Sequence, residues 1–233
     1  MLVVSLIVVA IGGIIQIIPT IFVKSNIKPV VDSEGNNVIM PYTPLELIGR
    51  DIYVAEGCYN CHSQMIRPLR FETERYGEYS KAGEFIYDHP FQWGSKRTGP
   101  DLAREGGLRS NAWHYQHMIA PKDLSPGSLM PAYPWMAEDL IDVSNLEKKI
   151  AVMRTMGVPY PEGYESQALA DLKAQARAIA EDILSDLKRG GYSDADIEKL
   201  HMTEIIAITA YLQRLGTDIK AVAKGEAETE TNE

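Results

Sequence analysis

The sequence predicts a mainly α-helical protein in which a single N-terminal transmembrane helix precedes one helical domain with long insertions. Three observations support this prediction. Residues 1–23 carry no charged side chain, and the segments that begin at Thr43 and Thr203 each combine a helix-capping residue with an apolar stripe. The composition, 45% hydrophobic and 24% charged, is typical of a globular protein and excludes a collagen, a wholly disordered chain and a polytopic membrane protein.

Residues 1–23 form the predicted membrane anchor. A helix of this length rises about 1.5 Å per residue and reaches roughly 35 Å, enough to cross a hydrocarbon core of about 30 Å. The alternative is a cleavable signal peptide, which needs a basic segment before the apolar core and small residues at the cleavage site. Here the first charged residue is Lys24, and Phe22-Val23-Lys24 is a poor cleavage site. We therefore expect an anchor.

A linker over residues 24–43 connects the anchor to the predicted domain, 44–216. The linker contains a short hairpin, because Val30-Val31 and Val38-Ile39 flank a cluster of turn-forming residues at 32–37. Thr43 is expected to cap the first helix of the domain, with Pro44 at its first position and Glu46 completing a capping box. The apolar side chains expected to be buried from this helix are Leu45, Ile48, Ile52 and Ala55.

This helix leads directly into Cys58-Tyr-Asn-Cys61-His62. In a C-x-x-C-H motif the two thiols form thioether bonds with the vinyl groups of haem, and the histidine binds the iron. A zinc site would need four ligands, and the chain has no second cysteine pair. A thioredoxin-like redox pair would follow a strand rather than a helix. The motif therefore predicts one covalently bound haem c.

A haem that carries electrons needs a second axial ligand, and we expect it to be Met130. This methionine lies in the segment 125–134, where three prolines and one glycine make an irregular but stiff loop. Met136 is the second choice. The other methionines that we considered lie too close to His62 or in an apolar stripe: Met65, Met153 and Met156.

Two further features surround this motif. His62 must donate its Nδ1–H to an acceptor, and the carbonyl of Pro100, on the turn Thr98-Gly-Pro-Asp-Leu102, suits that role. His114 and His117 are three residues apart and could share a helix face as a metal pair or as haem ligands. No cysteine or carboxylate accompanies them at ligand spacing, so a structural role is favoured.

Two more helices and a tail complete the domain organisation. The segment 203–216 reads as a helix capped by Thr203 and closed by Gly216, and a long helix within 169–187 is stopped by Gly190-Gly191. Residues 217–233, with five acidic residues and two lysines, are predicted to be a disordered acidic tail. The overall net charge of −9 argues against nucleic acid as a partner.

Together these motifs resemble a class I cytochrome c. The resemblance implies that the first and last helices of the domain cross, with Gly49 or Tyr53 meeting Tyr211. The N-terminal anchor and the run from Cys58 to Leu102 resemble more closely the mono-haem subunit II of cbb3-type cytochrome c oxidases. Two regions, about 63–97 and 137–200, are longer than a small cytochrome needs and are expected to be insertions.

This resemblance implies a non-catalytic electron-transfer subunit of a bacterial terminal oxidase in aerobic respiration. It would relay electrons from donor cytochrome c haems, on a di-haem subunit or a soluble cytochrome c, to the haem–copper catalytic subunit. With His62 and Met130 as iron ligands, no position is open for dioxygen. Trp93 and Arg97, beside the Pro100 turn, are expected to bind the haem propionates.

The resemblance also implies a location. Haem is attached to such motifs outside the cytoplasm in bacteria, so the haem domain would face the periplasm from a single-pass anchor in the inner membrane. Two alternatives stay open at this point. One is the anchored cytochrome c subunit of a nitric oxide reductase, and the other is a haem enzyme or gas sensor that acts alone.

Overall fold

The computed structural model describes residues 1–32, 34–188 and 191–221, together with the side chains of all of these except 19–26. Within these ranges the β structure is limited to two isolated bridges, Val31–Asn37 and Leu140–Thr203, so the predicted mainly α class is confirmed. The helices are α1 (Leu2–Asn26), α2 (Pro44–Ala55), η1 (Cys58–Asn60), α3 (Arg70–Tyr76), η2 (Ala82–Phe85), α4 (Asn111–Ile119), α5 (Pro121–Leu124), η3 (Pro134–Ala137), α6 (Leu146–Thr155), η4 (Tyr164–Ser166), α7 (Ala168–Leu187), α8 (Asp194–Leu200) and α9 (Glu204–Arg214).

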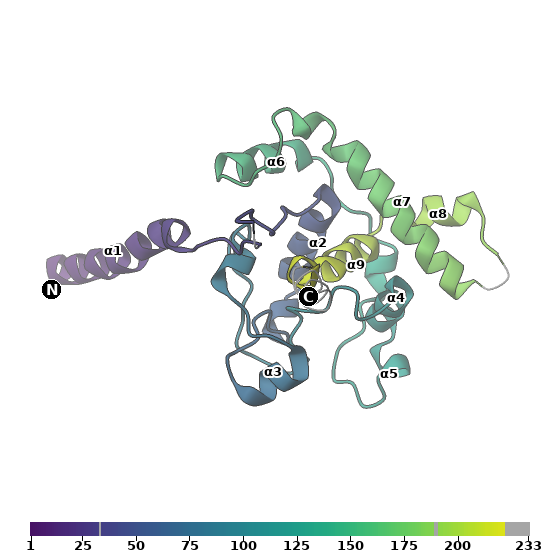
Figure 1. Cartoon of the computed structure of the whole chain (residues 1–233), viewed down its shortest axis with the longest axis horizontal. Coiled ribbons are helices and arrows are strands. Elements are labelled where there is room, and N and C mark those ends of the chain that lie inside the picture. Colours follow the sequence, from purple (N-terminus) through teal and green to yellow (C-terminus); the bar gives the residue numbers. More distant parts are fainter. Residues whose placement is uncertain (33, 189–190, 222–233) are drawn as a thin grey trace.

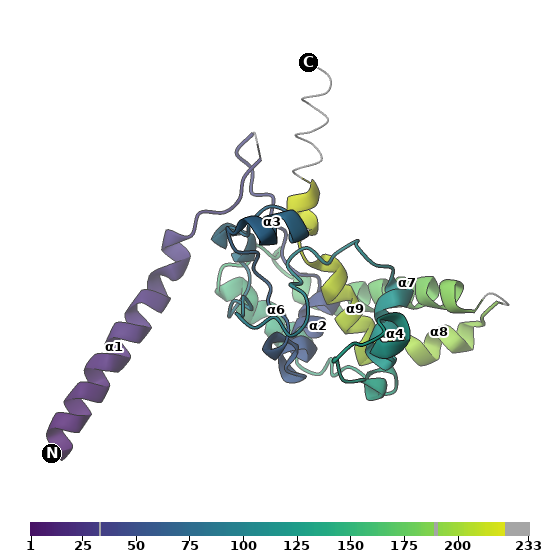
Figure 2. The same cartoon turned by 90° about the horizontal axis from the view of Figure 1, so that it is seen from below.

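Helix α1 projects away from the body that the other helices form (Figures 1 and 2). Its apolar side chains from Leu2 to Ile18 are largely exposed. Among the described residues, no helix combines the length and the apolar character of a membrane span. The membrane anchor over residues 1–23 therefore stays a prediction.

Helix α2 begins as its sequence predicts. The Thr43 hydroxyl accepts a hydrogen bond from the backbone N–H of Glu46 (3.3 Å), and the Glu46 carboxylate accepts one from the backbone N–H of Thr43 (2.8 Å). This reciprocal pair is the predicted capping box. Leu45, Ile48 and Ile52 are buried, but Ala55 is exposed, because the helix ends there as the chain turns towards Cys58.

Helix α9 crosses α2 at the centre of the fold (Figure 1). A Cβ atom on Gly49 would overlap the backbone carbonyl of Ala207, so the two backbones touch at this point. One turn further along α2, the rings of Tyr53 and Tyr211 lie 5.4 Å apart. The crossing that the resemblance implies is therefore present, and it involves both Gly49 and Tyr53. Thr203 occupies the N-cap position of α9, but its hydroxyl donates to the carbonyl of Leu200 (2.6 Å) and does not cap the helix.

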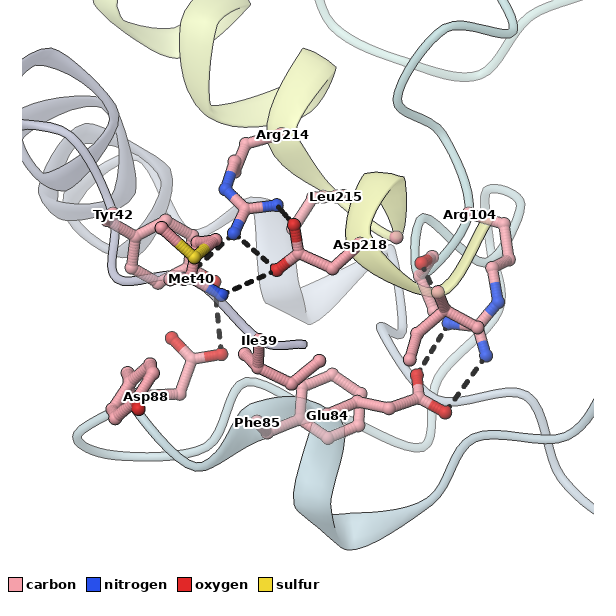
Figure 3. Close-up of a pocket in the computed structure, with 14 residues that line it drawn as sticks. Ile39, Met40, Tyr42, Glu84, Phe85, Asp88, Arg104, Arg214, Leu215 and Asp218 are labelled. Carbon is pink, nitrogen blue, oxygen red and sulfur yellow. Dashed lines mark hydrogen bonds and ion pairs between the residues drawn. The ribbon is translucent and has the colours of Figure 1, made fainter. Parts of the chain in front are cut away.

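The segment between α1 and α2 is tied to the body of the protein. It makes the predicted hairpin as a single bridge, Val31–Asn37. Beyond the hairpin, the backbone N–H of Met40 donates to Asp218 (2.9 Å) and its carbonyl accepts from Arg214 (2.8 Å), beside a cavity of about 50 Å³ (Figure 3). Residues 217–221 continue as helix, so the tail predicted to be disordered from 217 is ordered to 221; its remainder, 222–233, lies outside the described residues.

The two predicted insertions have different structures. Two buried ion pairs join the first, 63–97, to the rest of the chain, Arg50–Asp88 (2.6 Å) and Arg104–Glu84 (2.7 Å), and a third, Arg97–Glu72 (2.7 Å), lies within it. The second, 137–200, contains α6, α7 and α8. Helix α7 packs against α2, α4 and α9, and it ends at Leu187, just before the glycine pair that the sequence marks as its stop.

The close contact between α2 and α9 at Gly49 can be tested by substitution. Replacing Gly49 with alanine should lower the free energy of unfolding by about 3 kcal/mol, because the added methyl group displaces the backbone of Ala207 and overpacking a core costs about that much. Ala174→Val, which adds volume at an exposed position of α7, is the control and should cost under about 1 kcal/mol. Urea denaturation of both variants measures the difference. Equal stabilities would contradict the close helix crossing.

Candidate functional site

The C-x-x-C-H motif forms one tight turn at the end of α2. Gly57 adopts a left-handed conformation (φ +71°), which an L side chain rarely adopts, and the chain then enters η1. The backbone N–H groups of Cys61 and His62 both donate to the carbonyl of Cys58, at 3.1 and 2.9 Å. The two thiols and the imidazole therefore belong to a single turn. Burial raises the pKa of the Cys58 thiol to about 11, whereas Cys61 is exposed.

The imidazole of His62 is held in one orientation. Its Nδ1 lies 2.8 Å from the carbonyl oxygen of Pro100, the contact that the sequence predicts. A carbonyl can only accept, so Nδ1 carries the proton and Nε2 keeps its lone pair for a metal. Gly99 packs against the ring so closely that a Cβ atom there would overlap it. Burial lowers the pKa of His62, and the Pro100 hydrogen bond opposes that shift.

A cavity of about 600 Å³ opens beside His62, a volume within the range of cofactor sites. Of the predicted site residues, Cys58, His62, Pro100 and Met130 line it, and Cys61, Trp93 and Arg97 do not. Most of the exposed surface inside the cavity is apolar. The apolar side chains of the wall are Tyr53, Leu102, Leu108, Trp113, Met118, Ile208, Leu212 and Ile219.

The Met130 loop is fixed to α4. The backbone N–H of Tyr133 donates to the carbonyl of Met118 (2.8 Å), and that of Met130 donates to the hydroxyl of Ser128 (3.2 Å). Met130 is half-buried at the cavity wall. Met136, the second choice, is fully buried in the core and does not line the cavity. Met118 also lines it and was not predicted, because within a helical segment it reads as a core residue.

The two histidines of α4 also reach the cavity wall. His114 is 2% exposed, and burial, followed by the nearby His117 and Arg109, lowers its pKa to about 4. Within the described part of the chain, Nε2 of His114 and Nδ1 of His117 are buried without a hydrogen-bond partner. The sequence favoured a structural role for both, because their i, i+3 spacing shows a shared face but not what that face meets.

Trp93 and Arg97, which the sequence predicts to bind the propionates, do not line the cavity. Arg97 donates to the carboxylate of Glu72 (2.7 Å) and to the carbonyl of Met65 (3.0 Å), and Trp93 stacks on Phe91 with ring centroids 4.6 Å apart. Burial raises the pKa of Glu72, but hydrogen bonds from Arg67 and Arg97 outweigh it and lower that pKa to about 2. Arg97 therefore neutralises a buried carboxylate.

Four other basic residues contribute to the cavity wall, and none was predicted as part of the site. They come from distant segments: Arg75, Arg104, Arg109 and Lys220. Arg104 donates to both oxygens of Glu84, at 2.7 and 3.1 Å (Figure 3). The ammonium group of Lys220 donates to the carbonyls of Arg104 and Gly106. No local motif marks these residues, because tertiary packing alone brings them together.

The ion pair between Arg97 and Glu72 can also be tested by substitution. Arg97→Leu should destabilise the fold by about 3 kcal/mol, because it removes one of the two guanidinium partners of the buried Glu72. A bound cofactor should keep its visible spectrum. Arg70→Leu is the control, since Arg70 is 91% exposed in its pair with Glu74 and such pairs contribute about 0–1 kcal/mol. A changed spectrum with unchanged stability would instead place Arg97 at the cofactor.

Comparison with known proteins places the chain in a family. The sequence model of the family described as "Cytochrome C oxidase, mono-heme subunit/FixO" matches residues 1–219. The match includes the C-x-x-C-H turn, the Pro100 loop and the Met130 loop. No curated protein matches the chain.

Proposed function

The chain belongs to the family of mono-haem cytochrome c oxidase subunits (FixO), and on that premise we propose that it relays electrons to the catalytic subunit of a cbb3-type terminal oxidase. The haem that the family name implies would be a haem c bound covalently to Cys58 and Cys61. His62 and Met130 would be its axial ligands. The observation that carries the proposal is the Nδ1–Pro100 contact, which leaves Nε2 of His62 available beside the large cavity.

The residues of the cavity fit a haem in three respects. A single turn holds both thiols next to the metal-binding imidazole. Gly99 leaves room for that imidazole where any side chain would collide with it. The wall is mainly apolar, as the porphyrin ring requires, and Met130 offers a thioether from a loop that is fixed to α4.

When bound, the haem supplies one-electron exchange between ferrous and ferric iron. The roles of this chain's residues are to bind it, orient it and exclude water. His62 and Met130 would occupy both axial positions, so dioxygen would have no site on this chain. A thioether ligand and an apolar wall both favour the ferrous state and raise the reduction potential. The chain would then be a relay and not the site of oxygen reduction.

Partners and location follow from the same proposal. The uncharged segment 1–23 and the exposed apolar side chains of α1 support a single-pass anchor in the bacterial inner membrane. The haem domain would face the periplasm, where it would accept electrons from a di-haem subunit or a soluble cytochrome c. The acceptor would be the haem–copper catalytic subunit. The alternative, a nitric oxide reductase subunit, shares this plan of an anchor and a cytochrome domain.

Substitution of Met130 tests the proposed ligand set. Met130→Ala in the full-length chain should abolish the low-spin spectrum of a Met-ligated haem, while the haem stays covalently attached. Met156→Ala is the control, because Met156 directly follows α6 as its C-cap and lies outside the cavity wall. Optical spectra and intact mass measure both properties. If Met118→Leu removes the low-spin spectrum and Met130→Ala does not, Met118 is the ligand.

Purification of the intact complex decides between the two complexes. The detergent-extracted chain should copurify with a core that contains copper and consumes oxygen. Metal analysis and gas-consumption assays provide the measurement. A copper-free core that consumes nitric oxide would establish the alternative, and a chain whose thiols stay free in a host able to attach haem would refute both.

A further inference from the structure

The wall of the large cavity has two chemically distinct parts. One part is the turn that carries Cys58 and His62. Another includes His114 of α4, whose Nε2 lies 3.8 Å from the carboxylate of Glu105, together with Arg109 and Lys220. Lys220 is held there by the carbonyl of Gly106, next to Glu105.

The second part of the wall contains an unpartnered polar group. Only 2% of the surface of His114 is exposed, and its Nε2 atom has no hydrogen-bond partner within the described residues. The nearest carboxylate oxygen, on Glu105, lies 3.8 Å away, beyond hydrogen-bond distance. A buried donor without a partner destabilises the fold, so such groups are rare and usually indicate a ligand or water. His114 lines the cavity, so a group inside the cavity can reach it.

The chemistry of haem identifies that group. The vinyl substituents, which the two thiols would bind, lie on the opposite side of the porphyrin from the two propionates. A haem tethered at Cys58 and Cys61 would therefore present its propionates at the end away from the thiols. On the cavity wall, the unpartnered Nε2 of His114, when it carries the ring proton, and the guanidinium of Arg109 would be a donor and a cation suited to such a carboxylate.

We propose that His114 is a positioning residue that donates its Nε2–H to a haem propionate, with Arg109 beside it. This inference rests on the proposed function, because it requires a haem attached to Cys58 and Cys61. It differs from the expectation for Trp93 and Arg97, which do not line the cavity. The neutral state of His114 suits the role, since burial holds its pKa near 4 and a neutral imidazole keeps one N–H to donate.

Two other basic groups of the wall have hydrogen-bond partners of their own, and a third, Arg75, lies over the ring of Tyr76 with its Cζ 5.1 Å from the centroid. The guanidinium of Arg104 donates to both oxygens of Glu84 and to the carbonyl of Glu78 (3.3 Å). The ammonium group of Lys220 donates to two backbone carbonyls. His117 stacks on Trp113, with centroids 4.4 Å apart, and lies nearer to His62. His114 is therefore the buried donor best placed for a carboxylate in the cavity.

Resonance Raman spectroscopy of the haem-loaded, full-length chain tests the inference, because the propionate bending mode reports hydrogen bonds to the propionates. We expect His114→Leu to shift this mode while the covalent haem and the low-spin spectrum are kept. His114→Gln, whose amide N–H can take the place of Nε2–H, should restore it. His201→Leu is the control, since its imidazole lies near the carbonyls of Ile197 and Glu198 at the end of α8.

The possible results separate a failure of the inference from a failure of the proposed function. A mode unchanged in His114→Leu, or shifted only in His117→Leu, overturns the inference and leaves the proposed function intact. A wild-type chain without covalent haem would refute the proposed function as well. If His114→Leu does not accumulate, NMR of the reduced wild-type chain carries the test. An exchange-protected Nε2–H of His114 with a nuclear Overhauser contact to a propionate methylene supports the inference, and its absence overturns it.

Discussion

The close contact between the backbones of α2 and α9 at Gly49 positions the rest of the site. Because no side chain separates the helices there, Tyr211 of α9 reaches Gln64, two residues after His62. The tyrosine hydroxyl and the Gln64 amide exchange hydrogen bonds of 3.0 and 3.1 Å, both buried. The turn that holds Cys58, Cys61 and His62 is thus fixed at its start by α2 and just beyond its end by α9.

A second set of hydrogen bonds fixes the loop that orients the imidazole of His62. The loop that contains Pro100 is bound to the motif at two points, since the N–H of Gly99 donates to the carbonyl of Cys61 (2.9 Å) and that of Leu102 donates to Ser63 (2.8 Å). Asp101 accepts from the Ser63 hydroxyl (2.6 Å). The acceptor for His62 is therefore part of a stiff loop, which is how an outer hydrogen bond keeps a metal-binding histidine in one orientation.

Short sequence motifs correctly predicted the start of α2 and the hydrogen-bond partner of His62. The capping box of α2 depends on a few neighbouring residues and is present. The Pro100 acceptor is also present, although it lies 38 positions from His62, because a metal-binding histidine needs such a partner whatever its distance along the chain. Arg97, His114 and Lys220 show where sequence reasoning stops. Arg97 turns to a carboxylate twenty-five positions upstream, and Lys220 reaches carbonyls more than a hundred positions away. Pairings of this kind depend on how loops pack, which no short motif encodes.

Basic residues in buried ion pairs and basic residues on the cavity wall differ in how strongly they can act on a group in the cavity. The buried pairs Arg50–Asp88 and Arg97–Glu72 are neutral overall and lie outside the cavity wall, where they brace the segment 63–97. The wall itself is mainly apolar, and its basic side chains include Arg75, Arg104 and Arg109. Since a charge interacts most strongly where the dielectric constant is low, the compensated pairs have little effect on a group in the cavity. An unpartnered polar group of the wall, such as His114, would then be better able to tune a redox centre in the cavity.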